Sequence, residues 1–356
     1  TFRGETLSEN IPTLAEILKD YGYTNVAFTG GANVAGMMGF DRGFEIYDET
    51  GDTEAACRWL EENAGKRFFL FYHTYYTHDP YLPPPPYDTR YDPGYSGDIP
   101  SRKELMEETG VEEGEEWHGI WQVMHEQFWS KVDLADPADR RHLDALYDGA
   151  ISYVDNELIR ELLESLEETG NLDRTLIVFT SDHGEEFLEH GRLEHNSLYR
   201  EVARVPLIMR LPGTVPEGMR IEELVRTVDI LPTILDILGI PLQTVVQGTS
   251  LRPLLTGDEI QGLSVYADFN DYLPPVIESI RSGPWFLLMD QRAGEVNGEQ
   301  ESSFFFLYNT ENDPGETEDI SSRHPRIKEK LKKQLRAVRI ESSRKHAEEA
   351  RDQQSG

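Results

Sequence analysis

The stretch from Thr175 to Gly184 places the strongest constraint on how this chain can fold. Residues 176–180 are apolar or β-branched and carry no charge. Such a run predicts a strand buried on both faces, as in parallel sheets covered by helices. The strand runs into Asp182 and His183, and open α/β sheets bind ligands beyond the carboxyl ends of their strands. These two residues are therefore candidates for metal or anion chemistry, the alternative being that they only cap the next segment.

A second apolar run, residues 67–75, also leads into a His-Asp pair, which begins at His78. Two strands that end alike favour a shared site over two unrelated capping residues. A further histidine, His195, follows 13 positions after Asp182 and 12 after His183. The sequence therefore predicts that these four side chains converge at one edge of the sheet.

The order of helix and strand patterns predicts an α/β fold with a mostly parallel sheet sandwiched by helices, extending over residues 1–258. Within it, residues from about 88 to 140 are charged, irregular and rich in aromatic side chains, which indicates an insertion. From 259 to 356, short alternating strands separated by turn residues precede a charged helix. This pattern predicts a C-terminal α+β subdomain with a small antiparallel sheet.

Composition excludes several classes of function. The formal net charge of the 356 residues is −32, which argues against nucleic-acid binding because phosphate contacts need Lys and Arg. The single cysteine, Cys57, excludes an internal disulfide. No apolar run reaches the length of a membrane helix. The sequence carries no signal for an oligomeric state.

Seven blocks of the chain, in order, resemble the sulfatase family of the alkaline phosphatase superfamily. The most recognisable block is the one that contains Ser181-Asp-His-Gly184, and the resemblance extends along nearly the whole length. The blocks are Pro12–Tyr23, Phe69–Tyr81, Tyr147–Asp155, Phe179–Glu185, Arg204–Ile208, Val228–Thr233 and Leu307–Glu316. The resemblance implies an alkaline-phosphatase-like fold and a sulfuric ester hydrolase that acts on a sulfated small molecule or carbohydrate.

Site residues follow from the resemblance position by position. Asp182 and His183 match two protein ligands of a divalent cation, with Ca²⁺ as the family default. Mg²⁺ also suits the carboxylate, and an imidazole ligand admits Mn²⁺ or Zn²⁺. His78 and His195 match residues that contact the sulfate oxygens and help the alcohol to leave, one of them as a general acid. His190 is expected to lie behind the site.

One departure from the family concerns its nucleophile, a Cys or Ser in the pattern Cys/Ser-x-Pro-x-Arg that is converted to formylglycine. That pattern is absent from residues 1–356. We therefore expect a chain truncated at its N-terminus, with the formylglycine upstream, and we expect the chain by itself to be inactive because the two-step route needs the covalent nucleophile. Family habit implies a periplasmic or extracellular location, and no signal region is present in this chain.

Two other interpretations of the function stay open. A phosphoester or phosphonate hydrolase of the same superfamily would need further metal ligands, typically an Asp-x-x-x-His pair. Asp155 has no histidine at that spacing, which favours a single metal. The other interpretation is a non-catalytic binding protein that has lost its nucleophile. Only the upstream sequence separates this interpretation from a sulfatase.

Overall fold

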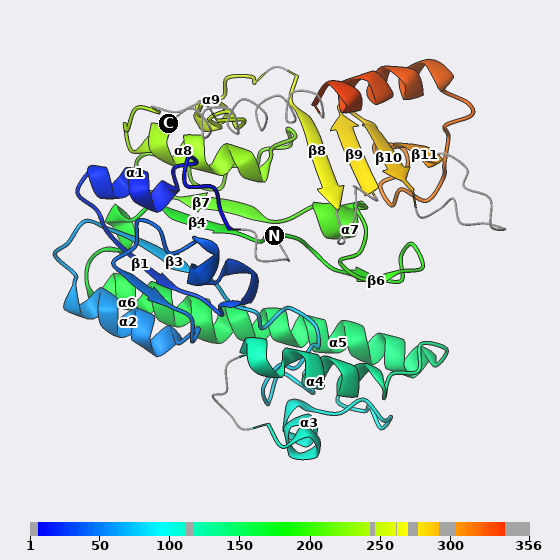
Figure 1. The fold of residues 1–356 in the computed structure, drawn as a ribbon, viewed down its shortest axis with the longest axis horizontal. Helices are drawn as coiled ribbons and strands as arrows, with labels where there is room; N and C mark the ends of the chain where they lie inside the picture. Colours follow the sequence, from blue (N-terminus) through cyan, green and yellow to red (C-terminus); the bar gives the residue numbers. More distant parts are fainter. Residues whose placement is uncertain are drawn as a thin grey trace. The chain divides into compact units, whose positions relative to one another are not determined.

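The structure is a computed structural model that describes residues 6–111, 117–242, 246–260, 262–269, 277–291 and 304–338. The chain forms two compact units, Thr1–Thr175 and Leu176–Gly356, and each is described by itself (Figure 1). The domain boundary expected near residue 258 stays a prediction.

A three-stranded parallel sheet lies at the centre of the first unit. Its strand order is β2-β1-β3, with β1 (Thr24–Phe28) in the middle between β2 (Ile46–Asp48) and β3 (Phe68–Tyr72). Val26 stands opposite a residue on each neighbour and is fully buried, as are most of the side chains of β1. The parallel arrangement confirms the predicted fold class for this part of the chain.

Six α-helices accompany this sheet in the described part of the first unit. The first is capped as its sequence predicts, because the Thr13 hydroxyl accepts from the Glu16 amide at 3.0 Å and the Glu16 carboxylate accepts from the Thr13 amide at 2.8 Å. Figure 1 shows α2 and α6 side by side, and their residues are in contact. The bounds are α1 (Leu14–Asp20), α2 (Thr53–Glu62), α3 (Arg102–Thr109), α4 (Trp117–Trp129), α5 (Pro137–Tyr153) and α6 (Arg160–Glu168).

The longest helix pattern, predicted over residues 142–168, starts earlier than expected and is interrupted. The earlier start has a local cause: the Asp136 carboxylate accepts from the Ala138 amide at 2.8 Å, and Pro137 occupies the first helical position. Between α5 and α6 the chain forms a π-helical turn, Val154–Ile159. Such a turn inserts an extra residue into the helix, and periodicity alone does not reveal it.

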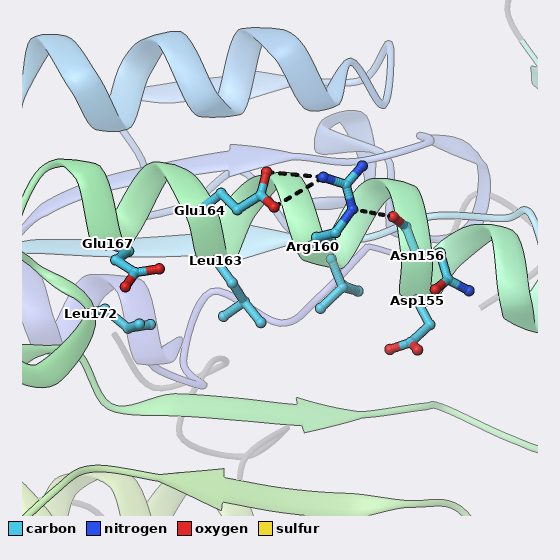
Figure 2. Close-up of a pocket in the computed structure, with 8 residues that line it drawn as sticks. Asp155, Asn156, Arg160, Leu163, Glu164, Glu167 and Leu172 are labelled. Carbon is cyan, nitrogen blue, oxygen red and sulfur yellow. Dashed lines mark hydrogen bonds and ion pairs between the residues drawn. The ribbon is translucent and has the colours of Figure 1, made fainter.

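A hollow of about 320 Å³ runs along this π-helical turn and α6 (Figure 2). Ile159, Leu163 and Leu172 supply its apolar lining. The cation at its rim, Arg160, lies 3.0 Å from both carboxylate oxygens of Glu164. Because the Arg160 guanidinium is already paired with the Glu164 carboxylate, the hollow does not offer the positive charge that a sulfate site needs.

The predicted insertion is fixed to α5 by aromatic packing. Tyr95 stacks on His142 with ring centroids 3.6 Å apart, and its hydroxyl donates to Asp139 at 2.8 Å. Burial lowers the pKa of His142, although the nearby Asp92 carboxylate opposes the shift. The neutral imidazole therefore serves as a packing element, and the aromatic side chains of this part of the insertion anchor it to the core.

In the second unit, β4 (Ile177–Thr180) pairs antiparallel with β7 (Leu207–Arg210). The expectation that this strand is buried on both faces is wrong: Phe179 is 38% exposed and Ile177 is only partly buried. Among the described residues, β4 pairs with β7 along one edge. A strand paired along one edge is less covered by neighbouring strands than a central strand, which explains why these apolar side chains are partly exposed. Two short strands, β5 (Glu186–Phe187) and β6 (Leu193–Glu194), form a ribbon after it.

The C-terminal sheet is antiparallel, as the sequence predicts, and its strand order is β11-β10-β9-β8. One face is covered by the helix over residues 325–338, drawn in orange and red in Figure 1, through Leu331 and Leu335. The other face packs against Leu198, a few residues after His195. This packing fixes one end of the segment that carries the candidate site. The strands are β8 (Ser264–Phe269), β9 (Ile277–Ser282), β10 (Trp285–Asp290) and β11 (Phe304–Asn309).

The described part of the second unit also contains three short helices, α7 (Arg200–Ala203), α8 (Ile230–Ile237) and α9 (Arg252–Leu255). The helix predicted over residues 225–238 begins instead as a 3₁₀ turn, Thr227–Asp229, that leads into α8. The Asp229 carboxylate accepts from the Arg226 amide at 2.9 Å and so caps this start. In the described part of the chain, no helix is both long enough and apolar enough to cross a bilayer.

Candidate functional site

In the second unit, the loop after β4 carries Asp182 and His183 side by side. The Asp182 side chain is 74% exposed, and its Oδ2 lies 3.7 Å from His183 Nε2. His183 Nδ1 lies 2.9 Å from the Gly184 carbonyl oxygen, which can only accept, so this nitrogen carries the proton. Nε2 is then the nitrogen with a lone pair, and it lies on the side of the Asp182 carboxylate. One hard oxygen and one imidazole nitrogen so arranged fit two ligands of a single divalent cation.

Gly184 lets this loop pass against α7. A Cβ atom at this position would lie 2.1 Å from the Glu201 carbonyl oxygen, a separation that no side chain tolerates. The Gly184 amide donates to the Val202 carbonyl at 2.8 Å, which holds the two backbones together. The close approach fixes the backbone directly beside His183.

We expect Gly184→Ala to destabilise the protein by about 1–3 kcal/mol, because the added methyl must displace backbone. The displaced loop should also lower activity about 100-fold, the cost of moving a catalytic group by roughly 1 Å. Denaturant unfolding and steady-state kinetics measure the two effects. Gly65→Ala is the matched control, since a Cβ there meets nothing within 4 Å. Equal behaviour of the two variants would contradict the steric argument.

His195 lies next to His183 in the same unit. Their rings stack with centroids 4.2 Å apart. His195 Nδ1 lies 3.4 Å from an oxygen of Glu185, whose side chain is only 3% exposed. A buried carboxylate that accepts from Nδ1 fixes the orientation of the ring and leaves Nε2 facing away from Glu185. Of the four predicted site residues, the structure thus brings Asp182, His183 and His195 together.

The side chain of His190, expected behind the site, is only 9% exposed. Its ring stacks on Tyr199 with centroids 3.6 Å apart, and its Nε2 lies 3.2 Å from Glu201. Its amide donates to Glu186 at 3.0 Å, a carboxylate with no exposed surface. These contacts tie the β5–β6 ribbon to α7, which is a structural role.

The fourth predicted residue, His78, belongs to the first unit and lies a few residues after β3. Its Nδ1 is 2.7 Å from the Asp79 carbonyl oxygen and 3.2 Å from the Asp79 carboxylate. Its side chain is 20% exposed, whereas Asp79 is almost completely buried. Its convergence with the three residues of the second unit stays a prediction.

Asp79 also receives contacts from helix α4 of the insertion. His125 Nε2 lies 2.9 Å from its carboxylate, and the Trp129 indole donates to the same oxygen at 3.4 Å. The Trp121 indole donates to the Asp79 carbonyl at 2.9 Å. Burial by itself raises the pKa of the Asp79 carboxyl, but the His125 hydrogen bond and the charges of His78 and His125 hold that pKa below its usual range.

Two residues of these clusters, Glu185 and His125, are not predicted from the sequence. Glu185 directly follows the Asp-His-Gly segment, and its position could have marked it as a partner for a nearby histidine. His125 carries no such signal, because it lies in an irregular insertion 46 positions after Asp79. A helical histidine among tryptophans is more often a packing residue than part of a site.

Two family models match the chain. The model described as sulfatase covers residues 3–240, and the model described as N-sulphoglucosamine sulphohydrolase, C-terminal, covers residues 188–341. The first match spans well over half of the sequence and includes all four candidate residues. The chain belongs to the sulfatase family. Membership of this family implies binding of a divalent cation, and the donors at Asp182 and His183 fit one.

Similar proteins include sulfatases and a multifunctional relative. The chain is 33% identical over 218 residues to the multifunctional alkaline phosphatase superfamily protein PehA of Trinickia caryophylli, covering 59% of this chain and 42% of that protein. It is 31% identical over 194 residues to arylsulfatase K of Rattus norvegicus, covering 51% and 32% respectively. The matched stretches thus span less than half of these curated relatives.

Solved structures share the fold over nearly the whole of this sulfatase chain. The phosphonate monoester hydrolase of Silicibacter pomeroyi has a TM-score of 0.70 at 21% identity, covering 95% of this chain and 81% of that one. The protein BT4656, solved in complex with its substrate D-glucosamine-2-N,6-O-disulfate, has a TM-score of 0.69 at 20% identity, covering 94% and 83%. These likenesses confirm the alkaline-phosphatase-like α/β fold.

Proposed function

We propose that this protein hydrolyses sulfate esters of a small molecule or carbohydrate with the help of a divalent cation. The observation that carries the proposal is the pair of donors after β4: Asp182 Oδ2 and His183 Nε2 lie 3.7 Å apart in a chain of the sulfatase family. We infer Ca²⁺ as the cation, with Mg²⁺, Mn²⁺ or Zn²⁺ as alternatives that the imidazole ligand admits. The cation would withdraw charge from the sulfate oxygens.

His78 and His195 are assigned to the sulfate ester. Each ring is held at Nδ1 by a carboxylate, that of Asp79 for His78 and that of Glu185 for His195. This arrangement supports Nε2 as the nitrogen that donates to sulfate oxygens. One of the two histidines passes its proton to the oxygen of the departing alcohol as the S–O bond breaks. The covalent nucleophile of the family, formylglycine, forms in the pattern Cys/Ser-x-Pro-x-Arg, which residues 1–356 do not contain.

A sulfated carbohydrate is the favoured substrate class. The substrate named for BT4656 is a sulfated glucosamine, and a further relative, 40% identical over 103 residues, is the N-acetylglucosamine-6-O-sulfatase of Bacteroides thetaiotaomicron. The second candidate function is hydrolysis of phosphonate or phosphate esters. The name of the PehA relative and the phosphonate monoester hydrolase fold support it.

A direct comparison of esters tests the proposal. The full-length protein, supplied with Ca²⁺ and in parallel with Mn²⁺, is assayed on an aryl sulfate, an aryl phosphate and an aryl phosphonate monoester. We expect the highest kcat/KM on the sulfate, loss of turnover with EDTA, and no turnover by residues 1–356 alone. A higher kcat/KM on the phosphonate would support the second candidate instead. Absence of turnover on every ester would favour the non-catalytic binding protein.

A further inference from the structure

We propose that helix α4 of the insertion orients His78 through Asp79, so that Asp79 and His125 are positioning residues for His78. This inference rests on the proposed function, in which His78 acts on the sulfate ester. It gives the insertion a part in the reaction in addition to its packing role.

The two carboxylate oxygens of Asp79 are divided between His78 and α4. Oδ1 lies 3.2 Å from His78 Nδ1, while Oδ2 lies 2.9 Å from His125 Nε2 and 3.4 Å from the Trp129 indole nitrogen. The Asp79 side chain is 2% exposed, so protein groups must supply the stabilisation that water would give. The direction in which Oδ1 points is therefore set by the donors that hold Oδ2.

Helix α4 is built to hold this contact. Trp121, His125 and Trp129 are spaced four residues apart and occupy one face of the helix. All three donate to Asp79, with Trp121 reaching its carbonyl oxygen at 2.9 Å. The neighbouring face carries Met124 and Phe128, which are almost fully buried and anchor the helix. The face toward Asp79 is consequently held in place by an apolar core behind it.

The consequence for His78 is geometric. Its Nδ1 is fixed by two oxygens of the same residue, the Asp79 carbonyl at 2.7 Å and the carboxylate at 3.2 Å. The Trp121 ring stands edge-on to the His78 ring, with centroids 6.2 Å apart. Loss of the Oδ2 donors would let the carboxylate turn and would change the angle at which His78 presents Nε2. Small angular errors in a catalytic group are costly, because reaction needs aligned atoms.

The experiment compares His125→Gln, His125→Asn and Asp79→Asn in the full-length enzyme. A Gln amide nitrogen reaches the position of His Nε2 and can still donate to Asp79, whereas the shorter Asn amide cannot. His142→Gln is the matched control, because His142 is another buried histidine, packed on Tyr95 rather than on Asp79. Each variant is measured for kcat and KM on the aryl sulfate, for thermal stability, and for the His78 ring ¹⁵N resonances at one fixed pH. The resonances are assigned by their loss in His78→Ala.

We expect His125→Asn and Asp79→Asn to lose about 10- to 100-fold in kcat with KM little changed, and to shift the His78 resonances. His125→Gln should recover most of kcat, and His142→Gln should lower thermal stability while leaving kcat unchanged. If His125→Asn does not fold, Trp129→Phe removes one Asp79 donor and should act in the same direction.

The inference is overturned if His125→Asn and Asp79→Asn lower stability like the control yet keep wild-type kcat and unchanged His78 resonances. Activity that survives in His78→Ala would contradict the proposed function rather than this inference. It would remove His78 from the proposed mechanism, while a resonance shift in His125→Asn would still support the link through Asp79. The two failures are therefore distinguishable.

Discussion

Asp182→Ala is expected to abolish divalent-cation binding and ester hydrolysis together. Carboxylate ligands set much of a hard cation's affinity, and Asp182 supplies the carboxylate next to His183 Nε2. Because its side chain is 74% exposed, its removal should change the stability of the cation-free protein by less than about 0.5 kcal/mol. The measurements are cation content per chain by elemental analysis, and the rise in melting temperature on addition of Ca²⁺.

The control for this experiment is Asp258→Ala. Asp258 is an exposed aspartate of the second unit and accepts from Thr256 rather than lying at the candidate site. It should keep the wild-type cation content, melting temperature shift and activity. Unchanged cation content in Asp182→Ala would show that the cation, if one binds, is held elsewhere.

The second large effect concerns the two histidines assigned to the sulfate ester. His78→Ala and His195→Ala should each lower kcat about 100- to 10,000-fold on a substrate with a poor leaving group, the range that a general acid contributes. One of the two variants should recover much of this loss on 4-nitrophenyl sulfate, because a good leaving group needs no proton. The other should remain impaired on both substrates, because it lost a contact to the sulfate itself. Steady-state kinetics on an alkyl and an aryl sulfate measure the difference.

His190→Ala serves as the comparison for both variants. His190 is buried on Tyr199 and bound to Glu201, so its loss should reduce stability without this dependence on leaving group. If neither His78→Ala nor His195→Ala depends on the leaving group, the general-acid assignment is wrong. The cation site at Asp182 and His183 would be unaffected by that outcome.

Local sequence signals were sufficient for most elements of this chain. The sequence pattern predicts strands over residues 24–28, 264–269, 277–281, 285–289 and 304–308, and the structure has β1 and β8 to β11 within a residue of these bounds. The aromatic-rich part of the insertion predicts a short helix near residues 117–129, and Thr13 followed by Glu16 predicts a capping box; the structure has both. These features depend on side chains a few positions apart, so the sequence contains their cause. The start of α5 was missed because Asp136 was not recognised as its cap.

Part of the candidate site was predictable for the same reason. Asp182 and His183 are adjacent in sequence and follow an apolar run, so their proximity at a strand end requires no long-range packing. The nearness of His195 to His183 is different. The rings stack because the β5–β6 ribbon turns the chain back, and Glu185 then meets His195 Nδ1. The short distance in sequence and the family resemblance both indicate His195, but neither predicts that its ring stacks on His183 or meets Glu185.

The sequence by itself determined the fold class and the family, and it marked Asp182 and His183 as candidate cation donors, because motifs and periodicity are local properties. The tertiary structure decided which nitrogen of each histidine carries the proton, since that depends on acceptors such as the Gly184 carbonyl and Glu185. It also decided that helix α4 reaches Asp79. A stripe of Trp121, His125 and Trp129 predicts a buried helical face but not what that face meets. The partner is set by packing between segments far apart in the chain, which no local pattern records.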